Sequence, residues 1–501
     1  MRSDIGRKEI RETKGGKEIS MKKTVAVVIS MLLGISMIAC SASKAENTQG
    51  QGSEAVETQS APAAAESDAE TASAGEYEYG VTEEGYTVIT NLDTSEEVTL
   101  TMAGWEGGPS ETDNLNQALE LFHEYYPNIT VEYTPSADSG EGHHGKIMTM
   151  FAANSAPDVF YCGSAYVHEF ADRGIIYDIT DIFNQVFSLD DYIPAALQCM
   201  QYNGRLYGIT SCNVGPQLYY NKDLFDEAGV EYPSPNPEEA WTWEEFIDAA
   251  EKLTKTDENG KVTQYGFYGL EDSELLTAYF NQFDMQYMSE DGKSFTATDD
   301  PNFKKIFENI KSLRTEYGVS PQAAFTESAG MNNVQMLLTG MVAMFVEGSW
   351  GMEETAESGV NFGVAPLPVM DGGHSATWGQ AHIHSIAANT EHFDEAWALL
   401  CFLGSDEYQL NMVREGLWTP NKTSCYEPEV IQTWLTENHP DGYDEFIYYF
   451  KDFSSIAPQT VMGGEAYDIF TEECQAYFDG NEDLDTVISD MRSRVDEVLQ
   501  E

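Results

Sequence analysis

The alternation of apolar and polar residues predicts a β-α-β unit near the start of the folded part of the chain. Apolar residues occupy every second position over 98–102 and again over 129–133, as in strands with one buried face. Between these segments, apolar residues recur at helical spacing from Leu115 to Phe122, and Pro127 ends the helix. We expect the two strands to be parallel and the crossover to be right-handed.

Further periodic segments continue along the chain. A helix over 146–153 and a short strand over 158–161 make the first lobe α/β. The run Thr242-Trp243-Glu244-Glu245 has the form of a capping box at the start of a helix. The continuous apolar run 341–346 is typical of a strand covered on both faces, and an amphipathic stripe over 484–498 predicts a closing surface helix.

The N-terminal segment has the features of a signal peptide. Residues 25–38 are apolar and follow Lys22-Lys23, and the run is shorter than the ~20 apolar residues that span a bilayer. We therefore expect a lipoprotein signal peptide over residues 21–39. Residues 1–20 are polar, fit no class of signal, and are interpreted as an over-long start of the gene.

The signal peptide ends in Met37-Ile38-Ala39-Cys40, which resembles a bacterial lipobox, with Met37 where Leu is preferred. The resemblance implies that Cys40 becomes the new N-terminus and carries a lipid that anchors the protein to the membrane. Cleavage near Ala39, giving a free secreted protein, is the alternative. Residues 40–76 lack aromatic side chains, so we expect a disordered acidic tether, and about 35 such residues span ~30 Å.

Length and charge limit the classes of function. The remaining part, of about 410 residues, is too long for one core, so we expect two lobes. The chain has 85 acidic and 26 basic residues and a net charge of −59, which argues against nucleic acid and against an anionic ligand. An acidic shell that keeps a secreted protein soluble explains the same charge without a special partner.

The cysteines predict no metal site. Besides Cys40 there are six, at positions 162, 199, 212, 401, 425 and 474, with no CxxC pair. An extracellular location would permit disulfides, and the sequence leaves open whether any form.

Five segments in order resemble family 1 of the bacterial extracellular solute-binding proteins, of the maltose-binding type. They are Tyr202–Ile209, Leu218–Phe225, Thr242–Phe246, Gly340–Met344 with Gly348-Ser349-Trp350, and Phe362–Pro368. The resemblance extends from Val98 to Leu499.

The resemblance implies a two-lobed, type II periplasmic-binding-protein-like α/β fold, in which each lobe is a mixed sheet flanked by helices and a hinge joins them. By analogy, the N-terminal lobe comprises residues 97–209 and 377–425, and the C-terminal lobe 210–376 and 426–501. The implied function is that of a monomeric receptor on the extracytoplasmic face of the cell membrane, which captures a carbohydrate between the lobes for the permease of an ABC importer. No catalysis and no cofactor are implied.

A sugar site needs aromatic platforms beside hydrogen-bonding groups. Trp350 lies in the Gly-Ser-Trp position where relatives place a stacking tryptophan, and a core tryptophan is the alternative. Trp105 and Glu106 lie on the loop after the first strand, the edge where open α/β sheets bind ligands, although a plain turn would also explain them. Ser164 and Tyr166 occupy a stretch that contacts ligand in relatives, but Ala165 replaces an acidic residue that some relatives carry.

Further candidates lie on the segments that cross between the lobes. Asn213 could reach the floor of the cleft or serve only in a turn. Trp378, Gly379 and Gln380 could approach the ligand, and a hinge would explain the glycine equally well. Glu465, beside Gly463-Gly464, is a weaker candidate, whereas we expect Arg414 and Trp418 to pack on the surface of a lobe.

Two other classes of function remain as alternatives. His143-His144 and the pair His382 and His384 would suit a zinc receptor, but no cysteine or carboxylate completes a ligand set at plausible spacing. A glycosidase would use two carboxylates, yet no nucleophile elbow, HExxH or phosphate loop occurs. A receptor that reports its ligand to a sensor kinase would use the same cleft as a transport component.

Overall fold

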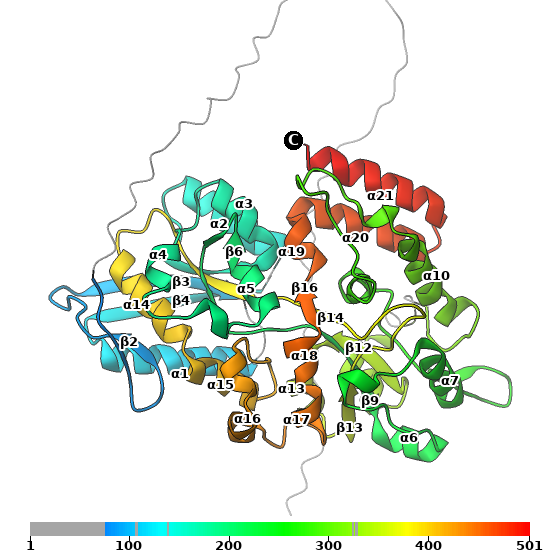
Figure 1. Ribbon diagram of the computed structural model, residues 1–501. Helices are drawn as coiled ribbons and strands as arrows, with labels where there is room; N and C mark the ends of the chain where they lie inside the picture. Colours follow the sequence, from blue (N-terminus) through cyan, green and yellow to red (C-terminus); the bar gives the residue numbers. More distant parts are fainter. Residues whose placement is uncertain (1–75, 106–108, 138–139, 323–324, 326–328, 501) are drawn as a thin grey trace, which may run out of the picture. The chain divides into compact units, whose positions relative to one another are not determined.

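The computed structural model in Figure 1 describes residues 76–105, 109–137, 140–322, 325 and 329–500. The chain divides into two units, residues 1–70 and 71–501, and every described residue belongs to the second. The predicted over-long start, the signal peptide, Cys40 and Glu106 lie outside the described residues, as does the tether apart from Glu76.

The first sheet contains five strands in the order β4-β3-β5-β15-β8. Their bounds are β3 (Val98–Trp105), β4 (Ile129–Ser136), β5 (Val159–Gly163), β8 (Ile209–Thr210) and β15 (His382–Ile386). β3 pairs in parallel with β4 and β5, whereas β15 runs antiparallel to β5 and β8, so the sheet is mixed. The predicted β-α-β unit is confirmed, with α1 (Pro109–Tyr125) as its helix.

The second sheet has β9 (Pro216–Asn221) at its centre, with antiparallel β12 (Met344–Gly348) and β13 (Phe362–Ala365) on either side. All six residues of β9 are buried, as expected for a central strand covered on both faces. The strand predicted over 341–346 begins later, at Met344. Val342 instead forms an isolated parallel bridge with Tyr265 before the strand starts.

Three segments run side by side where the chain connects the two sheets. β14 (Thr377–Gly379) pairs in parallel with β16 (Ser454–Ile456), and Val214 and Gln380 exchange two backbone hydrogen bonds of 2.9 Å. Figure 1 shows β14 and β16 next to each other. A Cβ on Gly379 would lie 2.5 Å from Asn213 Oδ1, so the close approach of these segments requires glycine there.

The buried side chains form two groups. The first surrounds the five-stranded sheet and also includes Trp434, Phe446 and Phe450, from the stretch after residue 425 that we assigned by analogy to the C-terminal lobe. The second surrounds β9, β12 and β13 from the other face and includes residues from Ala457 onward. The first group also contains Tyr219 of β9, so the exact lobe boundaries stay a prediction.

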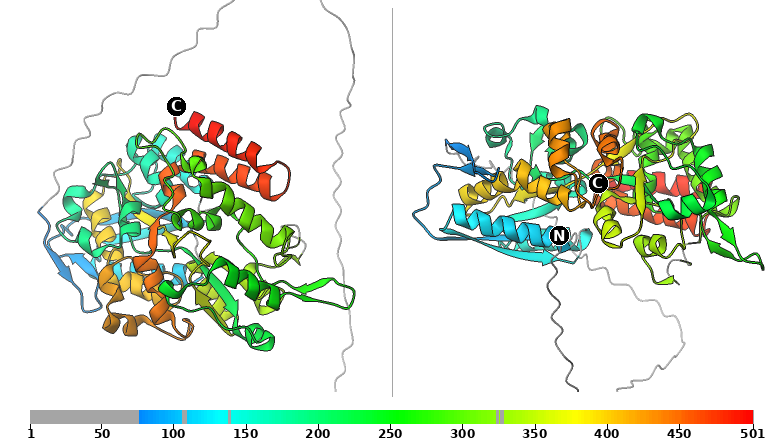
Figure 2. Two further views of the ribbon diagram at one scale, coloured as in Figure 1. Left: turned by 45° about the vertical axis from the view of Figure 1, so that its right-hand side comes forward. Right: turned by 90° about the horizontal axis from the view of Figure 1, so that it is seen from below.

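The predicted capping box and the predicted terminal helix are both present. The Thr242 hydroxyl accepts a hydrogen bond from the Glu245 N–H, and the Glu245 carboxylate accepts one from the Thr242 N–H, at the start of α7 (Trp243–Leu253). Helix α21 (Leu484–Val498) lies alongside α20 (Gly464–Phe478), as Figure 2 shows. Its buried face includes Val487, Met491 and Val495, as the stripe predicts.

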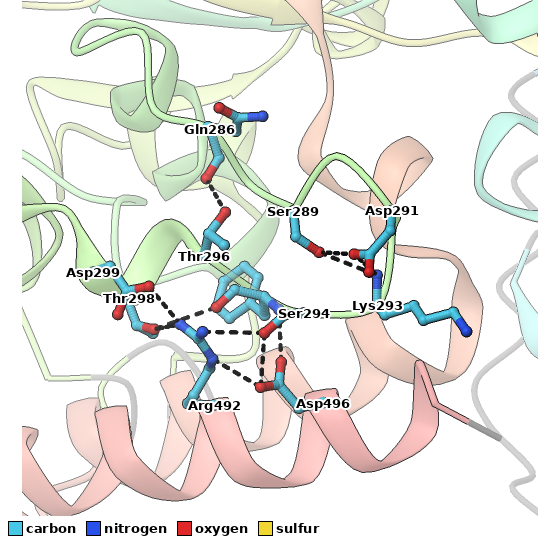
Figure 3. A network of polar contacts seen from close by, with 11 residues as sticks. Gln286, Ser289, Asp291, Lys293, Ser294, Thr296, Thr298, Asp299, Arg492 and Asp496 are labelled. Carbon is cyan, nitrogen blue, oxygen red and sulfur yellow. Dashed lines mark hydrogen bonds and ion pairs between the residues drawn. The ribbon is translucent and has the colours of Figure 1, made fainter.

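A polar network holds the other side of α21. Asp496 accepts hydrogen bonds from the Phe295 N–H at 2.7 Å and from the Ser294 hydroxyl at 2.9 Å (Figure 3). Arg492 donates to Asp496 at 2.9 Å and forms an ion pair with Asp299 at 3.0 Å. This network ties the last helix to the loop that precedes α10 (Pro301–Thr315).

The remaining strands are short. They are β1 (Tyr79–Val81), β2 (Thr87–Ile89), β6 (Gln201–Tyr202), β7 (Arg205–Leu206), β10 (Lys255–Thr256) and β11 (Val262–Gln264).

The remaining helices flank the sheets and connect them. They are α2 (Glu141–Ala152), α3 (Val167–Asp172), α4 (Thr180–Phe183), α5 (Pro194–Met200), α6 (Lys222–Ala228), α8 (Ser273–Leu276), α9 (Ala278–Asn281), α12 (Asn333–Leu338), α13 (Met352–Glu357), α14 (Phe393–Leu403), α15 (Asp406–Arg414), α16 (Pro428–Trp434), α17 (Tyr443–Phe446), α18 (Tyr448–Asp452) and α19 (Pro458–Met462). Short 3₁₀ turns occur at η1 (Ser164–Tyr166), η2 (Leu189–Asp191), η3 (Pro237–Glu239), η4 (Ala297–Asp299), η5 (Ser349–Gly351) and η6 (Thr423–Tyr426).

The six described cysteines are buried free thiols. Across the described ranges, no helix combines the length and the apolar character needed to cross a membrane.

Candidate ligand-binding site

A cavity of about 550 Å³ is lined by residues of the five-stranded sheet, of the connecting segments, of the turn that follows β12, and of α8, α19 and α20. Its aromatic lining comes from Trp105, Tyr166, Trp350, Trp418 and Tyr467. These residues belong to segments that are far apart in the chain. The cavity is therefore a product of the tertiary fold and has the size of a small-molecule site.

Trp105 ends β3, so it lies at the carboxyl edge of a parallel strand. Its indole makes edge-to-face contacts with Tyr161 and His382, at ring-centroid distances of 5.2 Å and 5.3 Å. Tyr161 also stacks on His382, with centroids 4.4 Å apart. Packed rings hold Trp105 in place, which leaves its half-exposed indole as a fixed wall of the cavity.

Ser164 and Tyr166 follow β5 in the turn η1. The Ser164 hydroxyl lies 2.7 Å from the Thr460 hydroxyl of α19, and the Tyr166 ring stacks on His144 with centroids 3.7 Å apart. Both residues line the cavity. The turn thus places an aromatic ring and a hydroxyl at the boundary with the last third of the chain.

Trp350 lies directly after β12, in the turn η5. Its indole covers Gly348, where an added Cβ would come within 2.3 Å of the ring, so the glycine makes room for the tryptophan. Trp350 is half-buried, and its ring centroid lies 6.5 Å from that of Trp378. The indole therefore has one packed side and one side that lines the cavity.

A polar triangle supplies the hydrogen-bonding groups. Gln380 donates to Glu274 Oε1 at 2.7 Å, and Gln459 donates to Gln380 Oε1 at 2.9 Å and to Glu274 Oε1 at 3.4 Å. The Trp378 indole N–H donates to the Glu274 backbone carbonyl at 3.0 Å, which anchors α8 to β14. Burial, together with the charges of Asp272 and Glu347, raises the pKa of Glu274 to about 7.

His382 adds a nitrogen to the same lining. The residue is 8% exposed, and its Nε2 has no hydrogen-bond partner among the described residues. Burial lowers the pKa of His382 to about 3, so the imidazole is neutral near pH 7. Glu111 and Asp468 contribute carboxylates to the lining.

The structure brings five of the predicted ligand residues to the cavity: Trp105, Ser164, Tyr166, Trp350 and Gln380. Four others do not line it. Trp378 and Gly379 are buried in the connecting strand, Asn213 is 0% exposed behind the wall that Cys212 and Val214 form, and Glu465 is exposed on α20 beside Gly464. Glu106 lies outside the described residues.

The expectation for Trp418 was wrong. This residue is 4% exposed and packs its ring edge against His382 at 5.2 Å, in the lining of the cavity, because the chain after α15 turns inward beside Asn213. Arg414, in contrast, forms a partly exposed ion pair with Glu407 at 2.7 Å.

Sequence reasoning also missed Glu274, Gln459, Tyr467 and His382 as lining residues. A local signal existed only for His382, through the alternation of His382 and His384 in a strand that continues from Gln380. The other three come from short helices or helix ends, whose position depends on the packing of distant segments.

Two smaller spaces adjoin the main cavity. One, of about 380 Å³, shares Glu274 with it and is also lined by Asp272 and Glu347. The other, of about 540 Å³, shares Trp350 and Leu417 with it. Among the described residues, no group of three or more His, Cys, Asp or Glu side chains is arranged to hold a metal ion.

Residues 108–410 match the model of a protein family, the bacterial extracellular solute-binding proteins. The match covers more than half of the chain. The chain belongs to this family. The matched segment contains four of the five predicted residues that line the cavity, at positions 164, 166, 350 and 380.

Proteins with similar sequences or structures support the assignment of this chain to the family. An sn-glycerol-3-phosphate-binding periplasmic protein of Agrobacterium fabrum is 23% identical over 375 residues, which cover 70% of this chain and 81% of the relative. The ABC substrate-binding protein Lmo0181 of Listeria monocytogenes, solved with cycloalternan, superimposes with a TM-score of 0.69 at 19% identity and covers 81% of this chain and 100% of its own. The GacH receptor of Streptomyces glaucescens, solved unliganded and with acarbose, gives a TM-score of 0.67 at 22% identity, with coverage of 81% and 100%.

These neighbours are two-lobed binding proteins of the maltose-binding type, and the expected type II α/β fold of this solute-binding protein is confirmed. By its family, it is a bacterial extracellular solute-binding protein. Its relatives in these comparisons are substrate-binding proteins.

Proposed function

We propose that this protein captures a carbohydrate in the 550 Å³ cavity and presents it to the permease of an ABC importer, while a lipid on Cys40 anchors it to the extracytoplasmic face of the membrane. The observation that carries the proposal is the pairing of aromatic walls with a polar triangle. Trp105, Trp350 and Trp418 line the same space as Glu274, Gln380 and Gln459.

This combination suits a sugar because a pyranose has apolar C–H faces and a rim of hydroxyl groups. Half-buried indoles offer flat apolar surfaces for the faces. The carboxylate and the two amides accept and donate hydrogen bonds to the rim. The protein contributes binding and orientation only.

Capture is coupled to the relative position of the two lobes. Trp105 ends β3 of the first sheet, whereas Trp350 lies in the turn after β12 of the second sheet. Both line one cavity, so a ligand that contacts both favours the closed arrangement of the lobes. The permease would then recognise the closed form. Asn213 and Gly379, where the connecting segments touch, are the positions that such a movement would strain.

An anionic solute, such as the glycerol phosphate named for the Agrobacterium relative, is the second candidate, because that relative covers most of this chain. The charge of the residues that line the cavity argues against an anionic solute. Within the described residues, no lysine or arginine lines the main cavity, whereas Glu111, Glu274 and Asp468 do. A phosphate in this cavity would find no cationic side chain among the described lining residues.

The proposal is tested by a thermal-shift screen of the protein with mono- and oligosaccharides, with glycerol 3-phosphate and zinc as controls. A ligand at a hundredfold excess over its dissociation constant stabilises the fold by ~2.7 kcal/mol. Stabilisation by a saccharide that is recovered intact supports the proposal. Stabilisation by glycerol 3-phosphate or zinc alone, or recovery of a hydrolysed saccharide, would refute it.

A further inference from the structure

Among the described residues, every Asp, Glu, Lys or Arg side chain that lines the main cavity or the two adjoining spaces is acidic. The main cavity and the two spaces that adjoin it are lined by carboxylates, and no lysine or arginine of the described ranges lines any of the three. Glu274 is shared by the main cavity and the 380 Å³ space, where Asp272 and Glu347 are its neighbours. Asp272 and Glu347 make the potential at this junction negative, and a cation bound there would favour the ionised form of Glu274, whose pKa is about 7 in the unliganded protein.

Only neutral side chains of the described residues donate hydrogen bonds to the Glu274 carboxylate. The hydrogen bonds to its carboxylate come from the side-chain amides of Gln380 and Gln459, and no ion pair is formed with it within the described part of the chain. Glu271, which lines the 380 Å³ space as well, differs in this respect because Arg314 lies 2.9 Å from its carboxylate. Glu274 is thus a half-buried carboxylate without a cation.

A second observation at the same place points to a ligand that donates hydrogen bonds. Gln459 lines the main cavity and is 4% exposed, and its carbonyl Oε1 has no hydrogen-bond partner among the described residues. A buried acceptor without a donor costs free energy, which a donating ligand group would recover. The Gln459 amide nitrogen is already used by Gln380 and Glu274.

We propose that the carbohydrate carries a free amino group, and that its ammonium binds at the junction of the cavities, donating to the Glu274 carboxylate and to Gln459 Oε1. This inference rests on the proposed function and defines its substrate class as an amino sugar or an oligosaccharide that contains one. An ammonium has three donors and no acceptor, so one group can donate to both acceptors. Its positive charge also offsets the carboxylates of Glu274, Asp272 and Glu347.

A hydroxyl group is the competing occupant. It would donate one hydrogen bond to Glu274, but it would leave the negative charge of the junction without compensation. An N-acetylated amine keeps an N–H donor and loses the charge. The comparison of free and acetylated amines on one sugar backbone therefore separates the role of charge from the role of hydrogen bonding.

The experiment measures the affinity of the protein by calorimetry for glucosamine oligomers and for N-acetylglucosamine oligomers of the same length, near pH 7. Cellobiose serves as a neutral sugar and spermidine as a cation without a sugar. We expect the free-amine oligomer to bind about tenfold tighter than its acetylated counterpart, and raised salt to weaken it. Glu274→Gln should remove the preference.

The control variant is Glu357→Gln, which removes the same charge from an exposed residue lining the 540 Å³ space, and which should keep the preference. The comparison of ligands on the unaltered protein is decisive even if Glu274→Gln folds poorly. Equal or tighter binding of the acetylated or neutral sugar would overturn the amine inference and leave the proposed function intact. Binding of spermidine with no saccharide bound would overturn both.

Discussion

The Glu274 carboxylate accepts a hydrogen bond of 2.7 Å from the Gln380 amide, which joins residues 106 positions apart in the chain. The Trp378 indole N–H strengthens the same junction by donating to the Glu274 carbonyl at 3.0 Å. Strand β14, which connects the two sheets, therefore also positions a carboxylate of the cavity. A ligand that binds to Glu274 would therefore contact a residue that is hydrogen-bonded to this connecting strand.

Trp350→Ala should weaken saccharide binding without unfolding the protein. The indole is half-buried and one side lines the cavity, so its loss removes a stacking surface, and we expect affinity to fall about tenfold to a hundredfold. Calorimetry gives the affinity and thermal denaturation the stability. A collapse of the melting temperature with affinity unchanged would instead make Trp350 a core residue.

Trp378→Ala is the matched comparison. This side chain is 0% exposed, so its truncation leaves a cavity in the core, and we expect a loss of about 3–5 kcal/mol in the free energy of unfolding. Urea denaturation measures the change. A stable variant that had lost only ligand binding would show that Trp378 acts in the site and not in the core.

Gly379→Ala should destabilise the contact between connecting segments. The new Cβ would lie 2.5 Å from Asn213 Oδ1 and 2.7 Å from Ala195 Cβ, and overpacking of this kind costs about 1–3 kcal/mol. Adding Asn213→Ala relieves the first clash, so the double variant should recover part of the loss in urea denaturation. No recovery would mean that the Asn213 contact is not the cause.

The local patterns of the sequence were sufficient for elements whose signal lies within one segment. Alternation specified β3 and β4, and reciprocal capping specified the start of α7, because these depend on neighbours one to four residues away. The insertion of β15 between β5 and β8 had no such signal. Sheet order depends on packing between distant segments.

The candidate site follows the same division. Trp105 and Trp350 could be found because Trp105 ends a recognisable strand and Trp350 follows one. Glu274 and Gln459 lie in short helical segments without a distinctive pattern, and only the fold brings them to Gln380. Trp418 was misplaced because nothing near it in the sequence shows that its ring packs on His382.

The stability of the unliganded protein should depend on pH through Glu274. Its pKa rises from 4.5 to about 7 in the folded state, so folding binds a proton in this range and stability decreases as pH rises from about 4.5 to 7. The groups that face it, Asp272, Glu347 and Tyr467, add no positive charge. Thermal denaturation should show Glu274→Gln more stable than the unaltered protein at pH 8 and similar to it at pH 4. A variant equally destabilised at both pH values would contradict this.

Asp496 should have the opposite effect. Burial raises its pKa, but hydrogen bonds from the Phe295 N–H, Arg492 and Ser294 outweigh burial, and the pKa lies below 3.8. The stabilisation is present above the unfolded pKa and is lost as pH falls through the folded value. Asp496→Asn should therefore flatten the acid limb of the stability curve near pH 3–4, measured by thermal denaturation. An unchanged limb would show that the network in Figure 3 contributes no charge-dependent stability.

The most direct test of the central claim is isothermal titration calorimetry of the protein with saccharides, followed by chromatography of the recovered ligand. We expect saturable binding of a saccharide to one site per chain, loss of affinity in Trp350→Ala, and recovery of the saccharide unchanged. Saturable binding of glycerol 3-phosphate with no saccharide bound, or recovery of cleaved sugar, would contradict it.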